Sequence, residues 1–280
     1  MNEPIIIGTR GSPLALVQAE AVRAHLLAAH PHLSPDDIRL EIIKTSGDRI
    51  LDRHLMLAGG KGLFTKEIEE AMLEGRIHCA VHSCKDMPTK LPAGLALVAW
   101  LKREDPRDAF MSQQYACFED LPEGARVGTA SLRRRAQALR LRPDLRIETL
   151  RGNVQTRMQK LADGQFDATF LAAAGLNRLG LASHARQLLS LDDFLPAPAQ
   201  GVVVVEAPLD NSRMIELLKP LHSAESFAAA EAERAFLAAL DGSCRTPIAA
   251  YSRLEGDVLH FRGQILGLSG AQVYERSLTA

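Results

Sequence analysis

Aromatic residues, cysteines and long apolar runs are all scarce in this chain, and each scarcity excludes a class of protein. Aromatic residues make up 5% of the 280 residues, which leaves few rings to stack on the bases of single-stranded nucleic acid. The four cysteines, Cys79, Cys84, Cys117 and Cys244, have no C-x-x-C spacing, so they form neither a metal knuckle nor a redox motif. No run of eighteen apolar residues exists, which excludes a membrane-spanning helix.

The charge balance and composition describe a globular protein of more than one domain. A net charge of −1 gives no overall attraction to nucleic acid, so any basic site must be local. The length favours two or three domains, and 46% apolar with 24% charged residues is typical of a folded, soluble chain. The N-terminus carries an acidic residue and enters an apolar strand at once, unlike a signal peptide. We therefore expect a cytoplasmic protein with reduced thiols, no membrane partner and no bound metal.

Strand-like and helical patterns alternate along the first two hundred residues. The expected strands are 5–8, 40–44, 79–82, 95–100, 126–128, 146–150 and 168–171, and the expected helices are 13–29, 65–74, 131–140 and 153–163. Such alternation predicts an α/β fold with two lobes, each built on a parallel or mixed sheet flanked by helices. Extended segments at 102–108 and 195–200 are typical of hinge crossings between lobes, and a buried strand at 202–207 is expected to return to the first lobe.

The chain changes character after about residue 223. An alanine-rich helix at 226–240 precedes short strands, which predicts a small α+β third domain. These strands are expected at 248–252, 258–268 and 273–277. The expected domains are lobe 1 at 1–101 and 202–219, lobe 2 at 106–196, and the third domain at 223–280.

Residues 82–88 read HSCKDMP, with the acid Asp86 beside the cation Lys85 at the point where an apolar strand ends. Pro88 lacks an N–H and cannot continue the ladder. The carboxyl ends of strands border the ligand crevice in open α/β sheets. A carboxylate placed there can transfer protons or stabilise a positive charge that forms in a reaction. An ordinary surface turn is the alternative for an isolated Lys-Asp pair, but the remaining motifs favour a catalytic group.

Two further segments have the composition of binding loops, and each has a plain structural alternative. Residues 9–13 join a strand to a helix with Ser12 as N-cap and Pro13 as the first helical residue. The free N–H groups together with Arg10 form an anion site, unless this is simply a capped helix. Residues 45–62 form a long polar loop without the spacing of a phosphate loop. Such loops are commonly lids, although plain flexibility fits the composition equally well.

Arginines are concentrated between positions 126 and 157, where nine occur with no lysine and only two acids. Arg133 and Arg134 begin a helix after one strand, and Arg151 and Arg157 occupy the equivalent place after the next. Both groups are therefore expected at the carboxyl edge of one sheet. Arginine suits bidentate recognition of carboxylate or phosphate, so the repeated placement favours a polyanionic ligand. Nucleic acid is a rival ligand, but no aromatic motif interleaves these arginines.

Cys244 lies in a glycine-containing loop directly after the helix of the third domain. A cysteine beside an arginine in a flexible turn can have a lowered pKa and act as a nucleophile or attachment point. Most lone cysteines are buried and inert, which is the interpretation kept for the other three.

Distinctive strings run in order through nearly the whole chain. They are TRGSPLALVQA at 9–19, GGKGLFTKE at 59–67, AVHSCKDMPT at 80–89, REDPRDAF at 103–110, VGTASLRRRAQ at 127–137, LRGNVQTR at 150–157, LAAAGLNRLGL at 171–181, AQG at 199–201 and GSCRTPIAA at 242–250. Together they resemble the porphobilinogen deaminase (hydroxymethylbilane synthase) family, and a chance match in this order is implausible.

The resemblance implies two lobes like those of periplasmic binding proteins plus a small α+β third domain. It implies a monomeric transferase of porphyrin and heme biosynthesis. Such an enzyme condenses four porphobilinogen molecules head to tail with loss of ammonia and releases hydroxymethylbilane. The family also carries a dipyrromethane cofactor, attached covalently by a thioether.

The resemblance assigns roles to the residues at matching positions. Asp86 is the catalytic carboxylate, and Cys244 carries the cofactor. The other cofactor-binding residues are Lys85, Asp48, Ser131, Arg133, Arg134, Arg157 and Gly175. The substrate-binding residues are Arg10, Ser12, Arg151, Arg178 and Gln200. Lys61 and Phe64 belong to a lid, which would keep a reactive intermediate from water.

Two departures from the family pattern concern the third domain. The cofactor loop reads GSCR where GGCQ is common, which keeps the thiol. The chain stops at Ala280, where the family usually continues into a helix, so we expect a third domain truncated at its C-terminus.

Two other functions compete with the deaminase. A non-catalytic two-lobed protein that binds an anionic metabolite would need neither Asp86 nor Cys244. A nucleic-acid-binding protein would use the arginines alone, with strongly salt-dependent binding.

Overall fold

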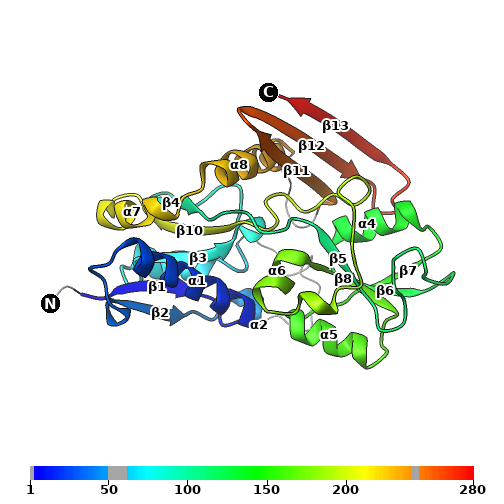
Figure 1. Ribbon diagram of the computed structural model, residues 1–280, viewed down its shortest axis with the longest axis horizontal. Helices are drawn as coiled ribbons and strands as arrows, with labels where there is room; N and C mark the ends of the chain where they lie inside the picture. The colour runs from blue at the N-terminus through cyan, green and yellow to red at the C-terminus, as the bar shows by residue number, and fades with distance from the viewer. Residues whose placement is uncertain (1–2, 50–61, 241, 243–245) are drawn as a thin grey trace. The chain divides into compact units, whose positions relative to one another are not determined.

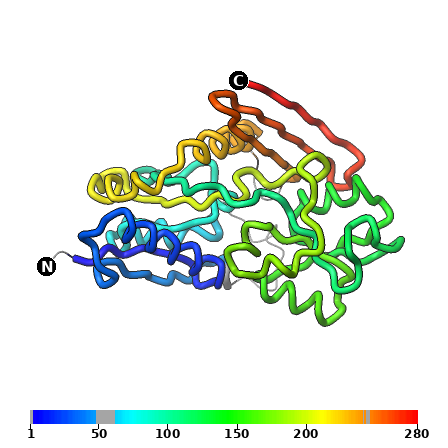
Figure 2. Tube along the Cα trace, viewed as in Figure 1, coloured from blue at the N-terminus to red at the C-terminus, as the bar shows by residue number. Residues whose placement is uncertain are grey.

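Three β-sheets organise the chain in the computed structural model, which describes residues 3–49, 62–240, 242 and 246–280, without the side chains of 48 and 49. The elements gather into two units. Unit 1 is Met1–Arg103 with Val202–Phe227, and unit 2 is Glu104–Gly201 with Ala228–Ala280. Figure 1 labels the helices and strands, and Figure 2 follows the same path as a tube.

The sheet of unit 1 has five strands in the order β2-β1-β3-β10-β4. Their bounds are β1 Ile5–Thr9, β2 Ile38–Ile42, β3 Cys79–Ser83, β4 Leu95–Trp100 and β10 Val203–Pro208. β1 runs parallel to β2 and β3, whereas β10 runs antiparallel to β3 and β4. The sheet is therefore mixed, and the prediction that the strand near 202–207 returns to the first lobe is confirmed.

Helix α1, at Pro13–Ala29, covers this sheet with a stripe of apolar residues. Val22 and Leu26 are fully buried against Ile7 of β1, within the largest apolar cluster of unit 1. The other helices of the unit are α2 Ser46–Arg49, α3 Lys66–Leu73 and α7 Ser212–Leu218.

The first sheet of unit 2 also has five strands, in the order β7-β6-β8-β5-β9. Their bounds are β5 Asp108–Met111, β6 Arg126–Gly128, β7 Arg146–Glu148, β8 Ala168–Ala172 and β9 Gln187–Leu188. β6 is parallel to β7 and β8, and β5 is antiparallel to β8 and β9. The helices are α4 Leu132–Leu141, α5 Val154–Ala162 and α6 Ala173–Arg178. Its core contains four packed rings, those of Phe110, Phe118, Phe170 and Phe194.

The third sheet is a three-stranded antiparallel meander of β11 Ile248–Glu255, β12 Val258–Leu266 and β13 Val273–Thr279. It packs on helix α8, Ala224–Ala239. Phe236 of the helix meets Phe261 of β12 with ring centroids 5.3 Å apart. Gly263 is required at this contact, since a Cβ there would lie 2.9 Å from the Phe236 ring.

The predicted fold class is confirmed: two mixed-sheet α/β lobes and a small α+β sheet. The differences from the sequence-based bounds are local. β2 occupies Ile38–Ile42 rather than 40–44. The expected hinge crossing at 102–108 runs into β5, which begins at Asp108. Within the described part of the chain, no helix is both long and apolar enough to cross a membrane.

Candidate active site

Asp86 stands at the carboxyl end of β3, as the sequence predicts. The strand ends at Ser83 and passes into a 3₁₀ turn, Cys84–Asp86, which Met87 closes by donating its N–H to the Cys84 carbonyl at 3.1 Å. The Cys84 N–H donates to Val202 O at 2.9 Å. Cys84 and Met87 are buried while Asp86 is exposed. The turn therefore presents a carboxylate to solvent from a rigid base.

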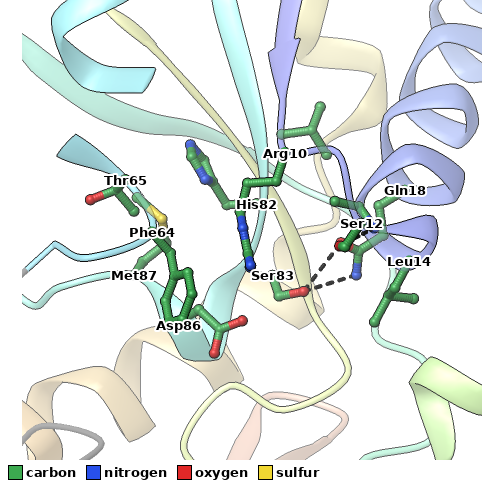
Figure 3. A pocket seen from close by; sticks show the side chains of 12 residues that line it. Arg10, Ser12, Leu14, Gln18, Phe64, Thr65, His82, Ser83, Asp86 and Met87 are labelled. Atoms are coloured by element: carbon green, nitrogen blue, oxygen red, sulfur yellow. Dashed lines mark hydrogen bonds between the residues drawn. The ribbon is translucent and has the colours of Figure 1, made fainter. Parts of the chain in front are cut away.

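A pocket in unit 1 brings Asp86 together with the anion site predicted at residues 9–13 (Figure 3). Ser12 caps α1 by accepting a hydrogen bond from the Ala15 N–H at 3.3 Å, and Pro13 is the first helical residue. The Arg10 guanidinium carbon lies 4.2 Å from the centroid of the Phe64 ring, a cation–π distance. The pocket thus combines an acid with cationic and hydrogen-bonding groups. Its lining residues are Arg10, Ser12, Leu14, Ala15, Gln18, Phe64, Thr65, Val81, His82, Ser83, Asp86 and Met87.

Two side-chain pairs at this pocket, Gln18 with Ser83 and His82 with Glu206, are not predicted by the sequence. Gln18 of α1 donates to the Ser83 hydroxyl at 3.0 Å, drawn dashed in Figure 3. His82 Nε2 lies 3.1 Å from Glu206 Oε2, and the Glu206 side chain is completely buried. In the sequence, Glu206 lies within an apolar run and carries no motif that marks it. The pairing of β3 with β10 places it near His82.

Glu69 of α3 adds a third titratable group to this cluster. Burial is the main reason that its pKa is raised above the usual value; Glu206 raises it further, and His82 opposes the shift. A carboxyl group with a raised pKa therefore lies close to the His82–Glu206 pair.

Arg133 and Arg134 lie in unit 2 and are almost fully buried on a shared carboxylate, that of Asp108. Arg133 Nη1 lies 2.7 Å from Asp108 Oδ2, and Arg134 Nη2 lies 2.6 Å from Oδ1. Ser131 caps α4 by accepting from the Arg134 N–H at 3.3 Å, which places both arginines on the first turn. Burial would raise the pKa of Asp108, but the two guanidinium groups outweigh it and hold this pKa below its usual range.

The Arg133–Arg134–Asp108 cluster carries two positive charges against one negative charge. Burial lowers the pKa of Arg133, and Asp108 opposes this effect. The buried Nε of Arg133 has no hydrogen-bond acceptor among the described residues. A buried donor without an acceptor is costly, so this cluster is suited to an added anionic ligand.

Two other predicted arginines of unit 2, Arg157 in the first turn of α5 and Arg178 in the last turn of α6, donate hydrogen bonds to backbone carbonyls. Arg157 Nε donates to the Gly152 carbonyl at 2.9 Å, and Asn153 caps α5 by accepting from Thr156 N at 2.8 Å. Arg178, at the end of α6, donates to Gly201 O at 2.7 Å, and burial lowers its pKa.

Other predicted positions in unit 2 are also placed by the fold. Arg151 is half-buried before α5, and Gly175 is buried in α6. Gln200 donates to Pro106 O at 2.8 Å and to Asp108 Oδ1 at 3.1 Å.

Three predicted site residues fall outside what the structure describes. Lys61 and Cys244 lie outside the described residues, and the side chain of Asp48 is not described. Lys85 is half-buried on the 3₁₀ turn before Asp86.

Burial raises the pKa of Cys79 to about 12, so this thiol has little nucleophilic character at neutral pH.

The geometry defines a class of protein: a two-lobed α/β protein with a carboxylate-bearing pocket in one unit and a buried arginine cluster, suited to anions, in the other. Residues 5–216 match the family model described as porphobilinogen deaminase, dipyromethane cofactor binding domain. Residues 227–279 match the porphobilinogen deaminase C-terminal domain. The chain belongs to the porphobilinogen deaminase family.

Curated relatives support this assignment over nearly the whole chain. The porphobilinogen deaminase of Nitrobacter hamburgensis is 55% identical over 269 residues, which span 96% of this chain and 85% of the relative. That of Paracoccus denitrificans is 55% identical over 272 residues, spanning 97% and 87%. Among solved structures, a periplasmic substrate-binding protein of an ABC transporter from Coxiella burnetii aligns with a TM-score of 0.48 and 15% identity, covering 82% of this chain and 96% of its own.

Proposed function

We propose that this chain is a transferase of tetrapyrrole biosynthesis that condenses four porphobilinogen molecules head to tail, with loss of one ammonia each. Hydrolysis by one water then releases the product as hydroxymethylbilane. The observation that carries the proposal is the match of both family domains over 5–216 and 227–279. The exposed Asp86 in a pocket with Arg10 and Ser12 supports it, since this chemistry needs a proton-transferring acid and sites for carboxylates.

Asp86 is proposed as the catalytic carboxylate. It would protonate the leaving amine of porphobilinogen, stabilise the positive charge left on the pyrrole and accept the proton that condensation releases. Its exposed position on a rigid turn supports this role, because a general acid must reach the substrate directly.

The acetate and propionate groups of porphobilinogen are proposed to bind cationic and polar side chains. Arginine is well suited to planar carboxylates. The proposed substrate-binding residues are Arg10, Ser12, Arg151, Arg178 and Gln200.

The chain carries the dipyrromethane cofactor binding domain of its family, and the residues present fit an anionic pyrrole group. The excess positive charge of the Arg133–Arg134–Asp108 cluster supports this fit, as does the Nε of Arg133, which finds no acceptor in the described part of the chain. When bound, the cofactor supplies the pyrrole end from which the product chain grows. We propose Cys244 as its covalent attachment. The other proposed cofactor-binding residues are Lys85, Asp48, Ser131, Arg133, Arg134, Arg157 and Gly175.

Phe64 and Lys61 are proposed as parts of a lid that keeps water from the reacting pyrroles. The contact of the Phe64 ring with Arg10 supports a place for Phe64 at the pocket.

The proposed domains, cellular location and oligomeric state follow from the same family. Lobe 1 at 1–101 and 202–219 would carry the acid, lobe 2 at 106–196 the arginines, and 223–280 the cofactor attachment. We propose a cytoplasmic monomer that binds a small molecule and no nucleic acid.

Ammonia release separates the proposed enzyme from the alternative, a non-catalytic protein that binds an anionic metabolite. Purified protein is incubated with porphobilinogen, and the ammonia released is compared with the porphobilinogen consumed. We expect one ammonia per porphobilinogen, with formation of the linear tetrapyrrole. Binding of porphobilinogen without ammonia release would reject the enzyme and favour the binding protein.

A further inference from the structure

Glu233 of α8 is completely buried, and its carboxylate joins two distant parts of unit 2. Its Oε2 accepts a hydrogen bond from the Ala199 N–H at 2.5 Å. Its Oε1 accepts one from the Ser252 N–H of β11 at 2.6 Å. Hydrogen bonds to a charged acceptor are among the stronger ones in proteins. Glu233 therefore ties the helix before the Cys244 loop and the strand after it to the segment around residue 199.

Ala199 has an unusual backbone conformation at the point where Glu233 holds it. Its φ is +61°, the one positive φ of a non-glycine residue among the described positions. It is also completely buried. The left-handed region is unfavourable for residues with a Cβ, and such strain persists only where the surroundings enforce it. The hydrogen bond from Ala199 to Glu233 is one such constraint.

The conformation at Ala199 sets the position of the next residue, Gln200. The turn is closed by a hydrogen bond from Gln200 N to Ala197 O at 2.9 Å. From there the buried Gln200 side chain donates to Asp108 Oδ1 at 3.1 Å, the same carboxylate that holds Arg133 and Arg134. Hydrogen bonds, joined by the peptide bond between Ala199 and Gln200, thus connect α8 and β11 to the arginine cluster.

We propose that Glu233 is a positioning residue: by holding Ala199 in the left-handed conformation, it fixes α8 and β11 relative to the Gln200–Asp108–Arg133–Arg134 group. The inference rests on the proposed function, in which Cys244 carries the cofactor and the arginines bind anionic groups. If the proposal is correct, loss of the Glu233 carboxylate weakens ligand binding through Asp108. It does not only disturb the packing of α8.

The test compares Glu233→Gln with Glu233→Gln combined with Ala199→Gly. In the Gln variant one of the two N–H donors faces an amide N–H₂ in place of an oxygen, so one hydrogen bond is lost. We expect kcat/KM for porphobilinogen to fall about 10-fold, the usual effect of losing a hydrogen bond to a charged group. Glycine adopts positive φ without a steric penalty, so the added Ala199→Gly change is expected to recover most of that loss. Glu225→Gln, an exposed position of the same helix, is the matched control.

Amide hydrogen exchange gives a second readout that does not depend on activity. In Glu233→Gln we expect faster exchange in peptides covering 196–201 and 105–111, reversed in part by Ala199→Gly. The proposal would be overturned if the exchange rates changed only in α8 and β11. It would also be overturned if Ala199→Gly did not restore the kcat/KM lost in Glu233→Gln. Should the Gln variant not fold, Glu233→Asp keeps the charge but is too short to hold both N–H groups, and the same pattern is expected. A wild-type protein that releases no ammonia would reject the proposed function, while the exchange comparison would still decide this inference.

Discussion

Asp86 combines an exposed carboxylate with a hydrogen-bonded turn, and this combination separates its proposed catalytic role from any role in stability. Cys84 and Met87 beside it are buried and hold the turn, whereas the acid itself contributes nothing to the core. For Asp86→Asn we expect kcat to fall at least about 100-fold, because the general acid is lost. The free energy of unfolding should stay within about 0.5 kcal/mol of wild type, as for other surface substitutions.

Steady-state kinetics and urea unfolding measure these two quantities separately. Asp163→Asn is the matched control, since Asp163 is exposed at the end of α5 and outside the pocket. Turnover of Asp86→Asn close to that of the control would remove Asp86 from the mechanism.

The raised pKa of Glu69 predicts a pH-dependent stability. Burial favours the neutral acid, so the folded state holds its proton to a higher pH than the unfolded state, whose pKa is near 4.5. The contribution of Glu69 is therefore fully present below about pH 4.5 and is lost as pH rises through the raised pKa. The titratable groups facing it are Glu206, His82 and Glu70.

Glu69→Gln removes this titration and should become more stable, relative to wild type, as pH rises from 4 to 8. Urea unfolding at several pH values measures the difference. Glu3→Gln, a substitution at an exposed position outside this cluster, is the control. A difference between wild type and Glu69→Gln that does not change with pH would contradict the account.

Residues that carry an exposed motif were easier to predict than those defined by tertiary pairing. Ser12 and Pro13 specify a helix start by local chemistry, and Asp86 stands beside a strand-breaking proline, so both parts of the pocket could be read from the sequence. Asp108 and Glu206 could not, because each acquires its role from a partner on a different element. In the sequence they belong to an expected hinge and an apolar strand.

At the scale of elements, the start of α5 depends on one glycine. Gly152 has φ +116°, and a Cβ there would lie 2.6 Å from Thr156 Cγ2. Its carbonyl also accepts the hydrogen bond from Arg157. We expect Gly152→Ala to lower the free energy of unfolding by about 2–3 kcal/mol and to weaken binding of anionic groups through Arg157.

Gly164→Ala is the matched control for this substitution. Its φ is +70°, but a Cβ there meets no neighbouring atom, so the cost should be about 1 kcal/mol from the backbone alone. Urea unfolding of both variants measures the difference. Equal losses of unfolding free energy in the two variants would show that the contact with Thr156 adds nothing to the cost of Gly152→Ala.

Strong periodicity and clear caps made most elements predictable, and short elements were missed for a physical reason. α1 and β4 have the predicted bounds. β5 and β9 are short and pair with each other at one edge of the sheet of unit 2, where pairing rather than local sequence defines them. α6 begins directly after β8 without a side-chain cap, so no start signal marks it.

For the whole molecule, the proposed cofactor chemistry depends on one thiol, Cys244, which follows α8 in the sequence. The cofactor domain and the C-terminal domain of the family are both present. The buried arginines of unit 2 supply positive charge beyond what Asp108 neutralises. A covalently held pyrrole group on Cys244 would unite these observations.

The most direct measurement is the intact mass of the purified protein, followed by peptide mapping of residues 242–247, with Cys244→Ser as control. We expect extra mass equal to two linked pyrroles, located on Cys244 and missing from the control. Folded protein with an unmodified Cys244 that gains no such mass on incubation with porphobilinogen would contradict it.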